Sequence, residues 1–201
     1  MSETEIVDPA VTDEDETTEE ATGQTAADIG QDAARAAWAE AAREVLIEVA
    51  GKYHAVISHQ DLAAEVQARS GVTTTQRSQH WIGHVLARVS AECAERGEPF
   101  LSSLCINTGG SVGEGYAVAV QTHTGETPAD PDAHAARQRL ACHQYFEAAD
   151  LPADGGGHTL TAKLRAARTR SRKAEREARP IPTCPVCNMA LPATGECDNC
   201  A

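Results

Sequence analysis

The sequence has no hydrophobic run that approaches the roughly 20 residues of a membrane-spanning helix, so we expect no membrane partner. Its first residues lack both the basic region and the apolar region of a secretory signal, which favours a cytoplasmic location. No Ser-His-Asp set, kinase motif or nucleotide-binding motif is visible. No small-molecule substrate is therefore identified, and we expect a non-enzymatic role.

Positive charge is missing from the first 29 residues, which contain ten Asp or Glu and no Lys or Arg. So acidic a segment cannot bury enough apolar surface to offset its chain entropy, which predicts a disordered tail over residues 1–29. The formal charge is −7 over residues 30–160 and +4 over residues 161–201, within a total of −13. The acidic total argues against indiscriminate nucleic-acid binding, whereas the basic C-terminal part permits a local contact.

Seven cysteines in a chain without signs of secretion indicate thiols or metal ligands rather than disulfides. Two C-x-x-C pairs stand in "CPVCNMALPATGECDNC" and comprise Cys184, Cys187, Cys197 and Cys200. Four thiolates suit a closed tetrahedral zinc site, which is structural because a catalytic zinc keeps an open position. The motif resembles a zinc ribbon over residues 181–201, with structural Zn²⁺ as the expected cofactor. A redox dithiol pair and an iron–sulfur site are the alternatives.

Residues 30–150 show the pattern of a mainly helical domain. Apolar residues at helical spacing predict four helices, over 32–50, 58–70, 75–96 and 130–149. Residues 100–107 and 116–120 are strand-like runs on either side of a glycine-rich turn, which predicts a β-hairpin. Three helices followed by a hairpin indicate an α+β fold of the winged-helix type, with the hairpin as its wing.

The stretches "AVISHQDLAAEV", "GEPFLSSLCIN" and "GGSVGEGY" resemble the winged-helix domain of alkylguanine-DNA alkyltransferases and their alkyltransferase-like relatives. This resemblance implies a DNA-binding scaffold. The family's Pro-Cys-His-Arg active site falls near residues 102–106, which here read "SSLCI". Cys105 lacks the following His that would help to form its thiolate, so the resemblance implies no alkyl transfer. On residue preferences alone, Cys105 is expected to be a buried strand cysteine.

The start of the predicted third helix carries side chains suited to base edges and phosphates. In a helix-turn-helix this end enters the major groove. The candidate contacts are Thr74, Gln76, Arg77, Gln79 and His80. A solvated helix start has a similar composition, because Thr and Ser also cap helices.

A second basic feature, "AKLRAARTRSRKAEREARP", predicts a charged helix over residues 162–180. Arginines recur there at three- and four-residue spacing, which aligns them as a ridge able to lie on phosphates; they are Arg165, Arg168, Arg172, Arg176 and Arg179. The alternatives are a solvated spacer helix, or a helix on which the acidic N-terminal tail folds back. The glycine-rich residues 151–161 before it are expected to be a flexible linker.

Taken together, the sequence predicts a DNA-associated protein, with transcriptional regulation as one role. Its winged-helix-like domain would be joined through the basic helix to a zinc ribbon. The alternative is a protein–protein adaptor that binds its partner through the acidic face and the ribbon, without binding nucleic acid.

Overall fold

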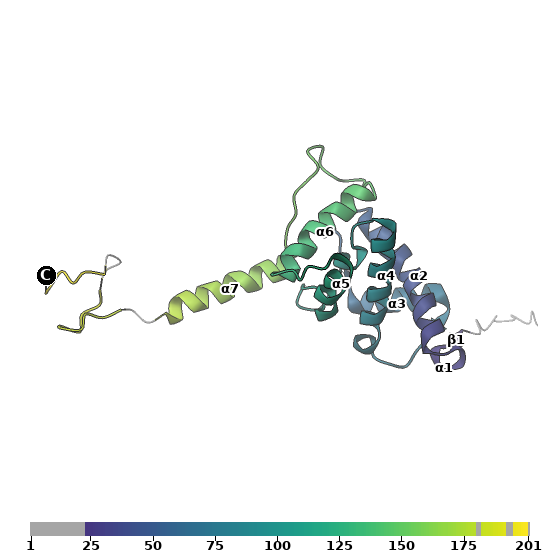
Figure 1. Ribbon diagram of the computed structural model, residues 1–201, viewed down its shortest axis with the longest axis horizontal. Helices are drawn as coiled ribbons and strands as arrows, with labels where there is room; N and C mark the ends of the chain where they lie inside the picture. Colours follow the sequence, from purple (N-terminus) through teal and green to yellow (C-terminus); the bar gives the residue numbers. More distant parts are fainter. Residues whose placement is uncertain (1–22, 180–181, 192–194, 201) are drawn as a thin grey trace, which may run out of the picture.

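The computed structural model describes residues 23–179, 182–191 and 195–200 (Figure 1). Most of the predicted acidic tail, residues 1–22, lies outside this range. The rest of it is folded. Strand β1 (Gln24–Thr25) leads into helix α1 (Ala26–Ile29), where Thr25 and Asp28 form a reciprocal capping box. The folded domain therefore begins earlier than residue 30, where the charge pattern placed its start.

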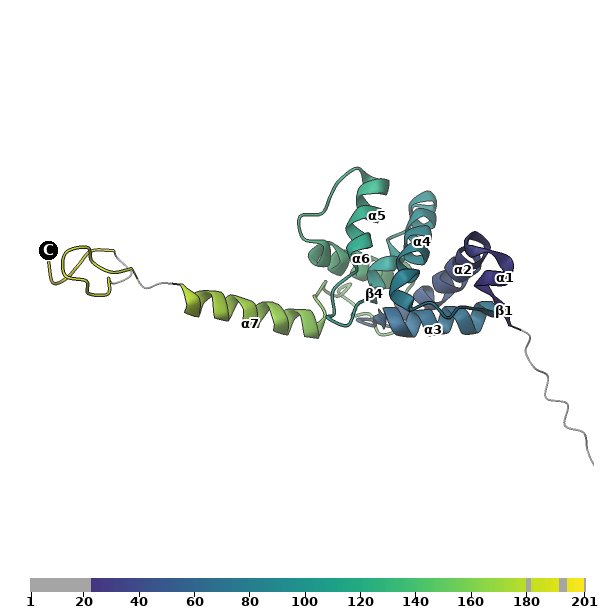
Figure 2. The ribbon, with the colours of Figure 1, turned by 90° about the horizontal axis from the view of Figure 1, so that it is seen from below.

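The domain is mainly helical, as predicted. Its helices are α2 (Gln31–Ala50), α3 (His59–Ser70), α4 (Ile82–Arg96), α5 (Glu114–Thr124) and α6 (Pro131–Tyr145). Helix α2 packs against both α3 and α4, and α5 packs on α4 (Figures 1 and 2). Ser58 caps α3 by accepting a hydrogen bond from the Asp61 amide, and Gly71 ends that helix at φ 67°. These cap residues confirm the predicted bounds of α3.

Two tryptophans form the centre of the core. Trp38 of α2 and Trp81 before α4 are each 1% exposed, and their ring centroids are 4.2 Å apart. The indole N–H of Trp38 donates to the carbonyl of Val72 at 2.8 Å, which satisfies its polar edge inside the core. Leu46 and Leu62 belong to the same core cluster and are fully buried.

The strands are short and parallel. Strand β1 pairs with β3 (Val72–Thr73), and β2 (Ile57–Ser58) pairs with β4 (Cys105–Ile106). Each strand contains two residues, so the strands join helix ends and do not form a separate layer.

The predicted β-hairpin wing is wrong. Residues 101–104 form the 3-10 helix η2, only Cys105–Ile106 is strand, and the predicted second strand lies within α5. Tyr116, Ala119 and Val120 face inward at helical spacing, whereas Val118 between them is 62% exposed. A short apolar run fits either period, and the tertiary contacts of α5 with α4 favour the helix here.

The predicted start of the third helix is also wrong. Helix α4 begins at Ile82 and not at Thr75, after the 3-10 helix η1 (Ser78–His80). The Thr74 amide donates to the Gln67 side chain at 2.8 Å, and the Gln76 amide donates to the Thr74 hydroxyl at 3.2 Å. These side chains replace helical hydrogen bonds at this point. The connection between α3 and α4 is therefore longer than the 3–4-residue turn of a helix-turn-helix.

Helix α7 (Ala162–Ala178) confirms the predicted basic helix and projects from the domain (Figures 1 and 2). Its base is attached. The Thr161 hydroxyl donates to the Gly110 carbonyl at 2.7 Å, and Arg168 pairs with Asp130 at 2.6 Å. A side chain at residue 110 would collide with Thr161, which accounts for glycine at this contact. From Thr169 to Arg179 every residue is exposed.

Residues 151–161, expected to be a flexible linker, hydrogen-bond to the domain. The Gly157 amide donates to the Tyr53 hydroxyl at 2.7 Å, and the Gln144 side chain donates to the Gly155 carbonyl at 2.8 Å. In the part of the chain that the structure describes, no helix is long and apolar enough to cross a membrane.

The pair between Asp130 and Arg168 predicts a specific acid sensitivity. The Arg168 guanidinium lowers the pKa of Asp130 to about 2, below its ordinary 3.8. A lowered folded-state pKa means that the stabilisation is complete above about pH 5 and is lost as the pH falls toward 2. In Asp130→Asn, which keeps the cap acceptor, we expect a smaller loss of unfolding free energy between pH 5 and 2. The difference should be about 0.5–1 kcal/mol in urea titrations, because the pair is part-exposed. Equal losses in the two proteins would contradict this coupling.

Candidate metal centre and basic surfaces

The four predicted metal ligands lie together. The Sγ atoms of Cys184, Cys187, Cys197 and Cys200 are all within 4.8 Å of one another. The Cys187 and Cys197 sulfurs are 3.5 Å apart. Sulfurs at the corners of a tetrahedron with metal–sulfur bonds near 2.3 Å are about 3.8 Å apart, so this cluster can hold a metal ion. The sequence spacing alone predicted this gathering of residues from two separate loops.

Backbone hydrogen bonds shape the turn that carries Cys184 and Cys187, here called the first knuckle. The Cys184 amide donates to the Met189 carbonyl at 2.8 Å, and the Asn188 amide donates to the Cys184 carbonyl at 2.9 Å. Asn188 has φ 55°, a left-handed conformation that asparagine tolerates better than most residues. An antiparallel bridge between Thr183 and Ala190 closes the loop. The turn thus holds the first two sulfurs on the same side of the backbone.

The thiols of the cluster have divergent acidities. Backbone N–H donors lower the pKa of Cys184, and a backbone hydrogen bond from Met189 is the main cause that lowers the pKa of Cys187 to about 6. A hydrogen bond from the Cys200 thiol to the Cys187 sulfur raises the pKa of Cys200 to about 11, because it stabilises the protonated form of Cys200. A divalent cation would replace such protons by binding all four sulfurs as thiolates.

The three remaining cysteines are buried in the domain. Cys93, Cys105 and Cys142 are each at most 1% exposed. Burial raises the pKa of Cys105 far above that of an ordinary thiol, and it raises the pKa of Cys142 to about 12. These thiols stay protonated near neutral pH. Cys105 is the buried strand cysteine that its residue type predicts.

The residues predicted to contact bases do not lie on an α-helix. Gln76, Arg77, Gln79 and His80 are exposed and Thr74 is half-buried, in the loop before η1 and in η1 itself. The groove-reading helix start that the sequence predicts therefore does not exist, since α4 begins after these residues. An exposed polar loop with one arginine remains.

The predicted arginine ridge divides into two parts. Arg165 donates to the Thr159 hydroxyl at 3.3 Å, and Arg168 bonds Asp130 and Asp132, so both face the domain. Arg172 and Arg176 lie on the exposed part of α7. Exposed basic residues that the spacing did not single out accompany them, namely Arg170 and Lys173.

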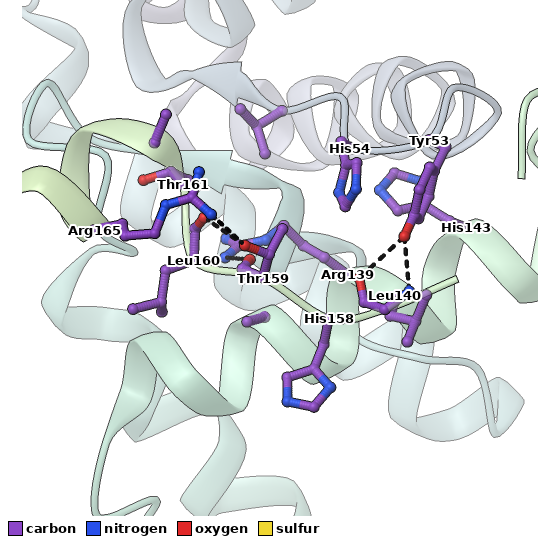
Figure 3. A pocket seen from close by; sticks show the side chains of 14 residues that line it. Tyr53, His54, Arg139, Leu140, His143, His158, Thr159, Leu160, Thr161 and Arg165 are labelled. Atoms are coloured by element: carbon purple, nitrogen blue, oxygen red, sulfur yellow. Dashed lines mark hydrogen bonds between the residues drawn. The ribbon is translucent and has the colours of Figure 1, made fainter. Parts of the chain in front are cut away.

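A cavity of about 710 Å³ lies at the base of α7 and was missed by the sequence interpretation (Figure 3). Its polar lining comes from three segments that are distant in the chain: Tyr53 and His54, Arg139 and His143 of α6, and residues 157–162 with Arg165. No spacing rule connects such segments. The structure brings them together because residues 151–161 return along α6.

No family model, curated protein or solved structure matched this chain. Neither the resemblance to the alkyltransferase winged-helix domain nor that to a zinc ribbon is supported by a related protein.

The cysteine cluster predicts that each chain binds one metal ion and that Cys184→Ser abolishes this binding, because three thiolates leave the tetrahedral site open. Elemental analysis of the purified protein gives the metal-to-chain ratio, which should fall from one to near zero. Val186→Ala is the matched control, since Val186 lies in the same knuckle and is 79% exposed. The melting temperature of the helical domain should not change. Full metal retention in Cys184→Ser would contradict the assignment.

Proposed function

We propose that this protein binds DNA without catalysing a reaction, and that the exposed part of α7 is its main contact surface. The observation that carries the proposal is a basic helix without buried residues, whose base is bonded to the domain through Arg168 and Thr161. Binding of this kind is suited to transcriptional regulation.

The exposed residues 169–179 of α7 contain five Lys or Arg and two Glu. A helix that is polar on all sides gains nothing from a core, so it depends on its own side-chain pairs or on a partner. Lys173 and Glu177 form one such pair at 3.8 Å, a weak contribution between exposed groups. Alignment on a phosphate backbone would neutralise the remaining positive charges and release counterions from the DNA.

We further propose that the cysteine cluster binds zinc as a structural ion. Zinc favours four thiolates in a tetrahedron, and a closed site of this type stabilises a module with too small a core. The described tail residues bury little besides Cys184, which is 3% exposed. The bound ion would take the place of a core at the distal end of α7.

The loop before η1 is a second, weaker candidate contact, through Arg77 and its polar neighbours. Among the described residues, no hydrogen bond or ion pair joins this loop to α7. The acidic character of the domain repels DNA elsewhere, which would restrict contact to these two basic or neutral surfaces.

A protein adaptor is the alternative function, and one observation favours it. Val186 and Met189 of the first knuckle are 79% and 57% exposed, although both are apolar. Exposed apolar side chains on a rigid turn suit a protein partner better than they suit a phosphate backbone. An adaptor of this kind would show no binding to DNA at any salt concentration.

The double variant Arg172→Gln/Arg176→Gln should weaken binding to a mixed-sequence duplex at least tenfold at low salt. It should also lower the slope of log affinity against log salt by about 1.8, since two phosphate contacts are lost. Fluorescence anisotropy across a salt titration measures both. The control is Arg88→Gln/Arg137→Gln, which removes the same charge from exposed positions on the domain. Absence of duplex binding by the unaltered protein would move the assignment to the adaptor.

Arg77→Ala tests the second surface. If the loop contacts the duplex, affinity should fall about three- to tenfold without a change in melting temperature, because Arg77 is exposed and makes no core contact. Unchanged affinity would remove the loop from the DNA-contacting surface and leave the assignment of α7 intact.

A further inference from the structure

The cavity at the base of α7 has an unusual balance of charge. Its fourteen lining residues include two arginines and three histidines but no Asp or Glu; the five are His54, Arg139, His143, His158 and Arg165. The surrounding domain is acidic overall. A positively lined cavity in an acidic domain points to an anionic ligand, because clustered cations repel one another without one.

Arg139 is the most informative residue of this lining. It is 6% exposed, and its guanidinium donates to the carbonyls of Ser103 at 3.1 Å and Thr159 at 3.5 Å. No carboxylate in the described residues lies within ion-pairing distance of it. Burial of an unpaired charge is costly, and these two neutral acceptors use only two of its five N–H groups. The remaining donors are available to a bound anion.

A second arginine lies beside the same residue. Arg165 donates to the Thr159 hydroxyl at 3.3 Å and Arg139 donates to the Thr159 carbonyl, so both guanidinium groups bond to Thr159 (Figure 3). Arg165 is exposed, which leaves its guanidinium open to a ligand. An anion bound beside Thr159 would accept a charge-assisted hydrogen bond from each arginine.

His143 adds an unpaired polar atom. It is 2% exposed, and its Nδ1 donates to the Ala50 carbonyl at 2.8 Å, since a carbonyl can only accept. Its Nε2 is buried and has no partner among the described residues. An acidic ligand group such as a phosphate hydroxyl could supply the missing hydrogen bond.

The start of α7 also lies at this cavity, through Thr161 and Ala162. Helix N-termini favour negative charge, yet the first turn of α7 has no acidic residue and contains Lys163 and Arg165. This reversal of the usual preference is stabilised if an anion binds where the free backbone N–H groups point.

We infer that this cavity binds the phosphate group of a small phosphate monoester. Phosphate has enough oxygens to accept from Arg139, Arg165 and the α7 N-terminus together, whereas a carboxylate has two. The volume of about 710 Å³ exceeds that of a free ion and leaves room for an organic part beside the apolar Val56, Leu140 and Leu160. A ligand there would join α6 to the base of α7.

Isothermal titration calorimetry of the full-length, metal-loaded protein with ribose 5-phosphate tests the inference, with ribose and inorganic phosphate as companion titrations. We expect one saturable site for ribose 5-phosphate with a dissociation constant below about 1 mM, weaker binding of inorganic phosphate and none of ribose. Arg165→Gln should weaken binding at least tenfold. Arg170→Gln, on the exposed part of the same helix, should change it less than twofold.

Arg139→Gln gives a second test and should also weaken the binding of ribose 5-phosphate. Its melting temperature is recorded to establish that the variant folds. If Arg139→Gln does not fold, Arg165→Gln alone provides the test. Absence of saturable binding of both phosphate probes, or equal weakening by Arg165→Gln and Arg170→Gln, would overturn the inference. A duplex with unphosphorylated ends separates the possible sources of the phosphate. If Arg165→Gln weakens duplex binding but leaves the affinity for ribose 5-phosphate unchanged, the cavity binds backbone phosphate and no small molecule, which would overturn the inference.

Discussion

Two neighbouring carboxylates, Asp130 and Asp132, join the parts of this molecule on which its candidate functions depend. Asp130 caps α6 by accepting from the amides of Asp132 and Ala133, each at 3.1 Å, and it also binds Arg168. Asp132 accepts from the hydroxyl and backbone of the loop before α5, at Ser111 and Val112. The same pair of residues thus fixes the start of α6, the glycine-rich loop and the base of α7.

The distribution of charge follows from this connection. Arginines at the base of α7 bond to the domain, while those beyond Thr169 are exposed. One continuous run of basic sequence therefore serves two purposes. Its first part closes a positively lined cavity, and its second part forms the exposed surface proposed to contact DNA. The acidic domain keeps these two positive regions distinct from the rest of the surface.

Local signals in the sequence predicted α2, α3, α6 and α7 well, although they missed α5 and the start of α4. Cap residues such as Ser58 and Gly71 act through backbone geometry within a few residues, so they are readable from sequence alone. The four clustered cysteines are predictable for the same reason, because a two-residue spacer forces both sulfurs of a pair to one side. The run 116–120 was misassigned since five apolar residues fit both a strand and a helix, and only packing on α4 decides.

The cavity could not be predicted, because its residues are adjacent only after residues 151–161 return along α6. Gly156 illustrates the difficulty. Its φ of 70° and its contact with the Tyr53 ring explain why glycine is present, but the sequence "GGGH" is equally typical of an unattached linker. The helix predicted to start at Thr75 is absent for a related reason. Hydrogen bonds from backbone amides to the side chains of Gln67 and Thr74 replace the first turn of that helix.

The length of α7 has a consequence for the size of any site on a duplex. The ten residues of α7 beyond Arg168, 169–178, span about 15 Å along the helix axis, which corresponds to about four base pairs of B-form DNA. The part before them is attached to the domain by the ion pair between Arg168 and Asp130. A duplex bound along the exposed part would therefore be contacted over less than half a helical turn, to one side of the globular domain.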